Sequence, residues 1–114
     1  MTRYNKGDVI LVPFPFSDQR TTKKRPAVIV SSDTYNNISQ DIIIMAITGQ
    51  TRSRIDIGEF LIEDWKSAGL LKSSAIKSAI STIEQRLVMR NLGKLSSKDL
   101  SALDKALKEL FDLR

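Results

Sequence analysis

Short apolar runs separated by polar segments fill the first two thirds of the chain. Residues 8–14 (DVILVPF) and 25–31 (RPAVIVS) are rich in β-branched and apolar residues, which predicts two strands. Pro13 and Pro15 are expected to end the first strand, because proline has no amide hydrogen to donate to a ladder. Residues 41–47 (DIIIMAI) are apolar on both faces, and this indicates a strand at the centre of a sheet.

The segments between and after these strands give weaker signals. They predict loops at 16–24 and 49–54, a turn at 31–37, a fourth strand at 55–62, one helical turn at 63–71 and a fifth strand at 73–80. Gly69 is expected to end the helical turn. Residues 82–90 (TIEQRLVMR) fit both a strand and a helix, so the pattern leaves that segment open.

The clearest pattern lies near the C-terminus. Ser96 to Asp99 (SSKD) resembles a capping box, with Ser at the N-cap and an acidic residue three positions later. Large apolar residues then recur at spacings of three and four, on one face of an amphipathic helix: Leu100, Leu103, Leu107, Leu110 and Phe111. Many short strands followed by a helix predict a mostly β fold, a small curved sheet or barrel with the C-terminal helix packed on it.

Composition narrows the possible functions. The 114 residues are expected to form one domain, 1–114, whose surface a partner subunit would help to cover. The chain has no Cys and no His, which excludes disulfides and thiolate metal sites and removes the commonest general base. A net charge of +5 favours anionic partners, nucleic acid first. No apolar run reaches the length of a membrane span and the N-terminus lacks a signal-peptide core, so we expect a cytoplasmic protein.

Polar side chains gather where the predicted strands begin and end. They are Lys23, Lys24 and Arg25 before one strand, Thr48, Gln50, Arg52 and Arg54 after another, and Lys72 and Lys77 around the fifth. If these ends share one rim, the cations would neutralise phosphates while hydroxyl and amide groups bond to phosphates or base edges. Phe14 and Phe16 are placed to stack on unpaired bases.

Each of these features also has a purely structural explanation. A run of cations is often a solvated cluster, and a Thr at a strand end often serves only the backbone. Phe14 and Phe16 equally fit core or dimer packing, and Trp65 fits packing alone. No nucleotide-phosphate or metal motif such as GxxxxGK[ST], HExxH or CxxC occurs. The residues alone therefore indicate a small, basic, β-rich domain suited to binding nucleic acid.

The order of the segments resembles a known family. GDVILVPFPFSDQRTTKKRPAVIVSSDTYN (residues 7–36) is similar to the N-terminal signature of the MazF/PemK toxin endoribonucleases, with its Pro-Phe-Pro and Lys-Arg-Pro elements. DIIIMAITGQ (41–50), LIEDWKSAGLLKSSAIK (61–77) and LGKLSSKDLSALDKALKELF (92–111) resemble later blocks of the same family, in the same order. The match covers nearly the whole chain, and the combination of elements is specific although each one is short.

The resemblance implies an SH3-like curved barrel with helices, a homodimer, and metal-independent cleavage of single-stranded RNA, usually mRNA, at short sequences. It implies no cofactor, and it implies a cognate antitoxin whose flexible segment occupies the RNA groove. Arg25 matches the Arg of Lys-Arg-Pro, and Thr48 matches the hydroxyl residue after the central strand; the family places both at the scissile phosphate. The expected RNA-binding residues are Phe16, Lys23, Lys24, Gln50 and Lys77.

Two departures from the family pattern leave the activity open. Gly49 stands where many relatives have Ser, and the segment Lys77-Ser78-Ala79 stands where some members carry an Arg-x-Asp pair used as acid and base. The general base is not identified, because arginine stays protonated and is a poor base. A non-catalytic member that binds RNA or an antitoxin peptide is therefore an alternative, and a gyrase poison of similar fold is a second one.

Overall fold

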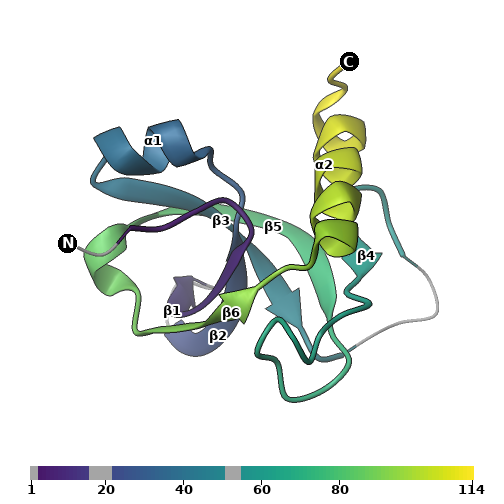
Figure 1. The fold of residues 1–114 in the computed structure, drawn as a ribbon, viewed down its shortest axis with the longest axis horizontal. Coiled ribbons are helices and arrows are strands. Elements are labelled where there is room, and N and C mark those ends of the chain that lie inside the picture. Colours follow the sequence, from purple (N-terminus) through teal and green to yellow (C-terminus); the bar gives the residue numbers. More distant parts are fainter. Residues whose placement is uncertain (1–2, 16–21, 51–54) are drawn as a thin grey trace.

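The computed structural model describes residues 3–15, 22–50 and 55–114 (Figure 1). In chain order the elements are β1 (Asp8–Pro15), β2 (Thr22–Ile29), α1 (Asp33–Ile38), β3 (Asp41–Thr48), β4 (Phe60–Leu61), β5 (Ala75–Glu84), the short 3₁₀ segment η1 (Gln85–Leu87), β6 (Arg90–Lys94) and α2 (Ser97–Phe111). In Figure 1, α1 lies toward the left and α2 toward the right, and most of the curled sheet lies below them. The prediction of a mostly β fold with a C-terminal helix is confirmed.

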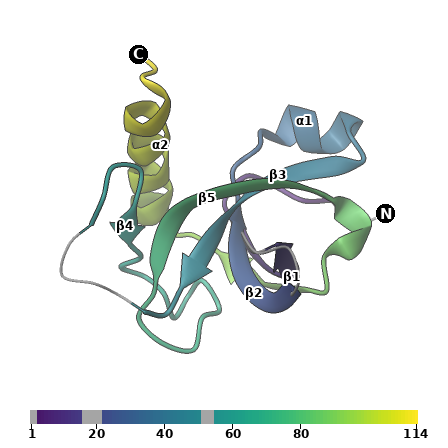
Figure 2. The same ribbon diagram turned by 180° about the vertical axis from the view of Figure 1, so that it is seen from behind.

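The strands form one antiparallel sheet in the order β4-β5-β3-β2-β1-β6. β3 has a neighbour on each side, and β5 curves alongside it (Figure 2). The side chains of β3 are buried on both faces, with Ile42 and Ile44 in one apolar cluster and Met45 and Ile47 in another. A central strand buried on both faces is what the sequence pattern predicts.

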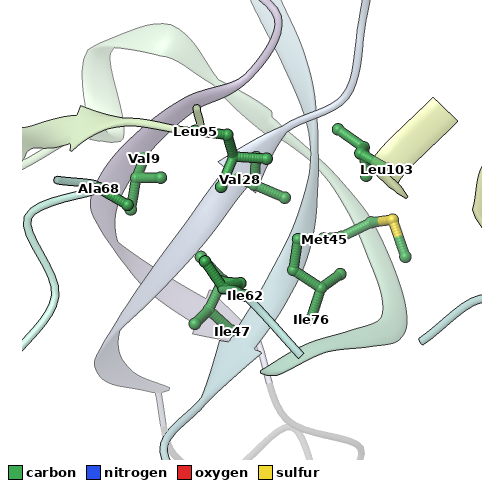
Figure 3. Close-up of a cluster of buried hydrophobic side chains, with 9 residues drawn as sticks. All are labelled: Val9, Val28, Met45, Ile47, Ile62, Ala68, Ile76, Leu95 and Leu103. Carbon is green, nitrogen blue, oxygen red and sulfur yellow. The ribbon is translucent and has the colours of Figure 1, made fainter. Parts of the chain in front are cut away.

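Two apolar clusters cover the two faces of the sheet. One is built from β1, β2, β3 and β5: Ile10, Val12, Phe14, Ala27, Ile29, Ile42, Ile44 and Ile83. The other lies on the opposite face, under α2 (Figure 3): Val9, Val28, Met45, Ile47, Ile62, Ala68, Ile76, Leu95 and Leu103. Alternate residues of the same strands belong to the two clusters. A shift of a strand's register by one residue would therefore move its side chains from one cluster to the other.

The apolar face of α2 covers the second cluster as its spacing predicts. Leu103 is fully buried there, and the partly buried side chains of Leu100, Leu107 and Leu110 pack against it. Phe111, the last residue of the predicted stripe, is 54% exposed and does not join the cluster. The stripe that packs on the cluster therefore ends at Leu110, one residue before the end of α2.

β1 continues through Pro13, and Pro15 is its last residue, one position beyond the predicted range. β1 pairs with β6 only as far as Leu11, while its pairing with β2 continues to Pro15. The Leu11 carbonyl accepts a hydrogen bond from the Met89 amide, on the side away from β2. The two-residue period places the nitrogens of Pro13 and Pro15 on that same side, where β6 has ended, so no ladder bond is lost.

β2 begins at Thr22, three residues earlier than predicted. Lys23 pairs with Phe14 and Lys24 pairs with Pro13, so both lysines lie on a strand and not in the predicted loop. The pairing of β1 with β2 therefore extends beyond the apolar run, because backbone hydrogen bonds to β1 hold even a polar segment in extended form.

The second half of the chain departs further from the predicted elements. The fourth strand is only Phe60–Leu61, the fifth extends to Glu84, and the predicted turn at 31–37 contains α1, capped by Ser32. The ambiguous segment divides into the end of β5, the 3₁₀ segment η1 and the first residue of β6. β6 was not predicted, because its sequence RNLGK has little β propensity and the strand exists through pairing with β1.

A loop of residues 62–74 brings the two edges of the sheet together. It leaves the edge strand β4 and packs on β6, the opposite edge: a Cβ built on Gly93 would lie 2.7 Å from the Ala68 carbonyl. Within the loop, residues 63–69 form hydrogen-bonded turns and not an α-helix. Gly69, with φ of +81°, ends these turns at the position predicted. The sheet is thus held in its curled shape by backbone contact between this loop and β6.

Asp99 fixes that loop to the start of α2. It is 1% exposed, and its two carboxylate oxygens accept hydrogen bonds from the amides of Glu63 (3.0 Å) and Asp64 (2.9 Å). Ser96 caps the helix by accepting a bond from the Asp99 amide (3.2 Å), as predicted. The acidic side chain of the predicted capping box thus bonds the loop amides of Glu63 and Asp64, with only a long contact (3.3 Å) from the Ser96 hydroxyl.

A second carboxylate, Asp8, is buried at the start of β1. Its Oδ2 accepts a hydrogen bond from the Asn5 amide at 2.9 Å. Burial raises the pKa of the Asp8 carboxyl above its ordinary value, and the bond from Asn5 opposes that effect. Asp8 closes the turn that precedes the strand.

Replacing Asp99 tests its role as an anchor. Asp99→Ala leaves two amides without their acceptor in a buried place, and we expect the free energy of unfolding to fall by about 2–4 kcal/mol. Asp104→Ala on the same helix removes only a half-exposed ion pair with Lys6, which is worth at most ~1 kcal/mol. Urea unfolding gives the free energy of unfolding of both variants. Equal losses would show that the Asp99 hydrogen bonds contribute no more than an exposed ion pair.

Candidate functional site

Pro26 sets the point at which the sheet opens. β2 and β3 pair only through Ala27, Val28 and Ile29, although both strands continue. Pro26 stands opposite Leu11, whose backbone groups face away from β2, so the Pro26 nitrogen faces away from β1 and toward β3. With no hydrogen on that nitrogen the ladder stops, and the strands are free to diverge beyond this pair.

Arg25 and Thr48 lie at the two sides of this opening. The last pair of the ladder is Ala27 with Ala46, and two further steps along the same register bring Arg25 level with Thr48. Residues at matching register positions share a face of the sheet. Both residues expected at the scissile phosphate are half-buried; Arg25 lines the groove described next, and Thr48 lines a smaller hollow beside it.

A groove of about 510 Å³ extends from this opening toward β6 and the loop of residues 62–74. Four cations line it: Lys24, Arg25, Lys72 and Arg90. Leucines and Ile47 form much of its apolar lining, Ser74 and Asn91 add polar groups, and none of the lining residues, all within the described part of the chain, carries a carboxylate. A concave surface with charge of one sign attracts a polyanion.

Lys72 lies across Gly49 in this groove. A Cβ built on Gly49 would lie 2.1 Å from Cε and 3.0 Å from Nζ of Lys72. The absence of a side chain at position 49 thus makes room for the stem of Lys72 and brings its ammonium group beside the end of β3. Lys72, noted only as a flanking cation in the sequence, supplies a donor at the place where relatives carry a Ser hydroxyl.

A second, smaller hollow of about 90 Å³ adjoins the groove at Thr48 and Gly49. Thr48, Gln50 and Lys77 line it together, so three of the predicted site residues do meet there. The hydroxyl of Thr48 accepts a hydrogen bond from the Gln50 amide at 3.1 Å. Asp56 and Glu59 line the same hollow, so carboxylates stand near Lys77 although its own segment has none.

A bulge in β5 shapes the smaller hollow. Met45 pairs with Ile80 and Ile47 with Ile76, so β5 carries two extra residues between these pairs. The bulge spans residues 77–79, the segment in which this chain departs from the Arg-x-Asp pattern. The Ser78 amide, which no longer faces a partner on β3, lies 3.4 Å from Oε2 of Glu59 and donates a long hydrogen bond to it. Bulges of this kind often occur beside functional sites.

The chain matches the family described as PemK-like, MazF-like toxin of type II toxin–antitoxin system over residues 5–111. The chain belongs to this family. Among solved structures, a mycobacterial endoribonuclease in complex with its cognate antitoxin is 18% identical, with a TM-score of 0.78 over 97% of this chain and 97% of that chain. The Mycobacterium tuberculosis toxin MazF-mt6 is 21% identical, with a TM-score of 0.75 over 94% and 98%. MazE-MazF from Deinococcus radiodurans is 14% identical, with a TM-score of 0.77 over 99% and 100%. At these identities the structures show a shared PemK/MazF fold.

Other predicted site residues of this PemK/MazF chain fall in different places. Phe14 is 6% exposed within an apolar cluster, so it is a core residue. Lys23 is exposed but does not line the groove, whereas its neighbour Lys24 does. Phe16, Arg52 and Arg54 lie outside the described residues.

Sequence reasoning missed three charged residues of the site: Arg90, Asp56 and Glu59. Arg90 belongs to the strand that was not predicted. Glu59 lies in a segment predicted as a strand with no distinctive motif, and only the fold brings it beside Lys77. Within the described ranges, no cluster of His, Cys, Asp and Glu side chains could hold a metal ion, and no helix is long and apolar enough to span a membrane.

Two glycines of the groove provide a matched test of this geometry. An added Cβ would meet Lys72 Cε at 2.1 Å in Gly49→Ala and the Leu92 carbonyl oxygen at 2.0 Å in Gly69→Ala. The lysine stem can move and the backbone cannot, so we expect Gly49→Ala to change stability by less than about 1 kcal/mol. Gly69→Ala, at a φ of +81°, should cost about 2–4 kcal/mol, from the left-handed conformation and the clash together. Thermal unfolding measures both, and the reverse order would contradict the described packing.

Proposed function

We propose that this chain is the toxin of a type II toxin–antitoxin system and acts in the cytoplasm as a metal-independent endoribonuclease on single-stranded RNA. One observation carries the proposal: a groove lined by four cations, Arg25 among them, adjoins the hollow that Thr48 lines. Such a groove suits a phosphate backbone. Solved endoribonucleases with the same fold support RNA as the substrate, and the family resemblance favours mRNA.

In the proposed reaction the 2′-hydroxyl oxygen attacks the adjacent phosphorus. The bond from phosphorus to the 5′ oxygen breaks, which gives a 2′,3′-cyclic phosphate and a 5′-hydroxyl end. Arg25 stabilises the extra negative charge on the phosphorane and donates a proton to the leaving oxygen. Thr48 donates its hydroxyl hydrogen to a phosphate oxygen, since its oxygen already accepts from the Gln50 amide.

The remaining polar residues of the two hollows would hold the flanking nucleotides. Lys24, Lys72 and Arg90 are placed to neutralise phosphates along the groove. Gln50 and Lys77 line the smaller hollow and suit a sugar hydroxyl or a base edge. Lys23 stays a prediction because it does not line the groove, and Phe16 stays one because it lies outside the described residues.

We also propose that a cognate antitoxin segment occupies the same groove. Structural relatives are complexes of a toxin with its antitoxin. Leu71 stands at the edge of the groove and is 98% exposed, which suits an apolar side chain of a peptide in extended form. The proposal includes a homodimer, supported by exposed apolar residues such as Leu87 and Met89 at η1 and just after it.

A non-catalytic member that binds RNA or the antitoxin peptide is the second candidate. The sequence Lys77-Ser78-Ala79 favours it, because the acid–base pair of some relatives is absent from that segment. Incubation with long single-stranded RNA separates the two candidates: binding without new 5′-hydroxyl ends supports the second one and contradicts the first.

Replacing Arg25 tests the proposed chemistry. With EDTA present throughout, wild type should cleave, and Arg25→Ala should cleave about 10²–10³-fold more slowly, because charge stabilisation at the phosphate is lost. Arg25→Lys should not restore the rate, since a point charge cannot reproduce the two-pronged contact. Arg86→Ala, an exposed arginine outside both hollows, is the matched control and should cleave normally. Normal cleavage by Arg25→Ala, or cleavage only after metal is added, would overturn the mechanism.

Neighbouring lysines on β2 test the course of the RNA backbone. Lys24 lines the groove and Lys23 does not, so Lys24→Ala should weaken binding of single-stranded RNA more than Lys23→Ala. For Lys24→Ala, the slope of log K against log salt should become shallower by about 0.7, the value expected when one phosphate is no longer neutralised. Fluorescence anisotropy over a range of salt concentrations provides both numbers. A drop in affinity that does not depend on salt would exclude an ion pair between Lys24 and a phosphate.

A further inference from the structure

The proposed cleavage needs a group that takes the proton of the 2′-hydroxyl. The chain contains no His, and Lys, Arg, Thr, Ser, Asn and Gln do not accept a proton at neutral pH in their ordinary forms. Of the described residues that line the groove and the smaller hollow, Asp56 and Glu59 are the ones with a carboxylate. An assignment of the base to one of these two carboxylates rests on the proposed function, because the base acts in the proposed RNA cleavage.

The smaller hollow brings Glu59 together with other polar residues of the site. Ala75 on β5 pairs with both Thr48 and Leu61, so Glu59 comes two residues before the position that shares a row with Thr48. Glu59, Lys77 and Thr48 nevertheless line one hollow, and the groove that Arg25 lines adjoins it.

Two backbone amides hold the Glu59 carboxylate. Oε1 accepts from the Asp56 amide and Oε2 from the Ser78 amide, each at 3.4 Å. Bonds of this length are weak, so they orient the group and leave its lone pairs available to a substrate hydroxyl. Glu59 is half-buried in the hollow, whereas Asp56 is exposed, and this favours Glu59 of the two.

We propose that Glu59 is the general base of the reaction. Its carboxylate takes the proton of the 2′-hydroxyl while the 2′ oxygen forms the new bond to phosphorus, and the bond to the 5′ oxygen breaks. The leaving oxygen takes a proton from Arg25. The step leaves Glu59 protonated and Arg25 neutral, and transfer of one proton through solvent from Glu59 to Arg25 restores both. Lys77, the cation beside Glu59, offsets the repulsion between this carboxylate and the phosphate.

A substitution that keeps the shape of the side chain tests the role. The cut site is first mapped on a long single-stranded RNA with wild type, and a short fluorescent oligonucleotide with that site is then used. Glu59→Gln keeps an acceptor oxygen for the backbone amides but takes no proton, and single-turnover cleavage should slow by at least about 100-fold. Glu59→Gln should bind the same oligonucleotide, made with a 2′-deoxy sugar at the cut position, with an affinity within about threefold of wild type. This is expected because a general base lowers the barrier to cleavage and does not contribute to ground-state binding.

The controls distinguish chemistry from structure. Glu109→Gln, at an exposed glutamate on α2 that lines neither hollow, should cleave within about threefold of wild type, since a residue outside the reaction has little effect on its barrier. Added formate should raise the rate of Glu59→Ala, and chloride at equal ionic strength should not, because a small carboxylate can replace a missing base but not a missing support. Near-normal cleavage by Glu59→Gln, an equal loss in Glu109→Gln, or no response to formate would overturn the assignment. If wild type itself makes no cut, the proposed function fails.

Discussion

The missing amide hydrogen of Pro26 sets the form of the candidate site. Its nitrogen faces β3, so the ladder that joins the two central strands ends at Ala27. Beyond that point β2 is held by β1 alone and β3 by β5 alone. β2 places Arg25 in the wall of the groove, and β3 places Thr48 in the wall of the adjoining hollow, so both side chains are positioned by strands.

A second constraint keeps the groove in shape. The buried Asp99 carboxylate holds the amides of Glu63 and Asp64 at the start of α2. The loop that follows packs its backbone on β6 and contributes Lys72 to the groove, where Gly49 leaves space for it. The helix at the C-terminus thus supports the site from a distance: α2 anchors the loop, the loop closes the curled sheet, and the closed sheet gives the groove its far wall.

The sequence predicted those parts of the molecule that local patterns determine. The apolar run of β3 and the capped, amphipathic α2 follow from residue types and spacing alone. β6, the extension of β2 to Thr22 and the bulge at residues 77–79 depend on pairing between distant segments, which no local pattern records. The same reason explains the site: Arg25 and Thr48 follow from the family resemblance, whereas Arg90, Asp56 and Glu59 become visible only when the strands are placed side by side.

The central claim is that single-stranded RNA lies in the opening beside Pro26. Backbone amide NMR during titration with an RNA made uncleavable by 2′-deoxy sugars tests it most directly. We predict that the largest shifts occur at Lys24, Arg25, Gly49 and Lys72, which line the groove. Shifts concentrated instead around Arg3 and Arg86, which line a separate hollow next to α1, would contradict this placement of the RNA.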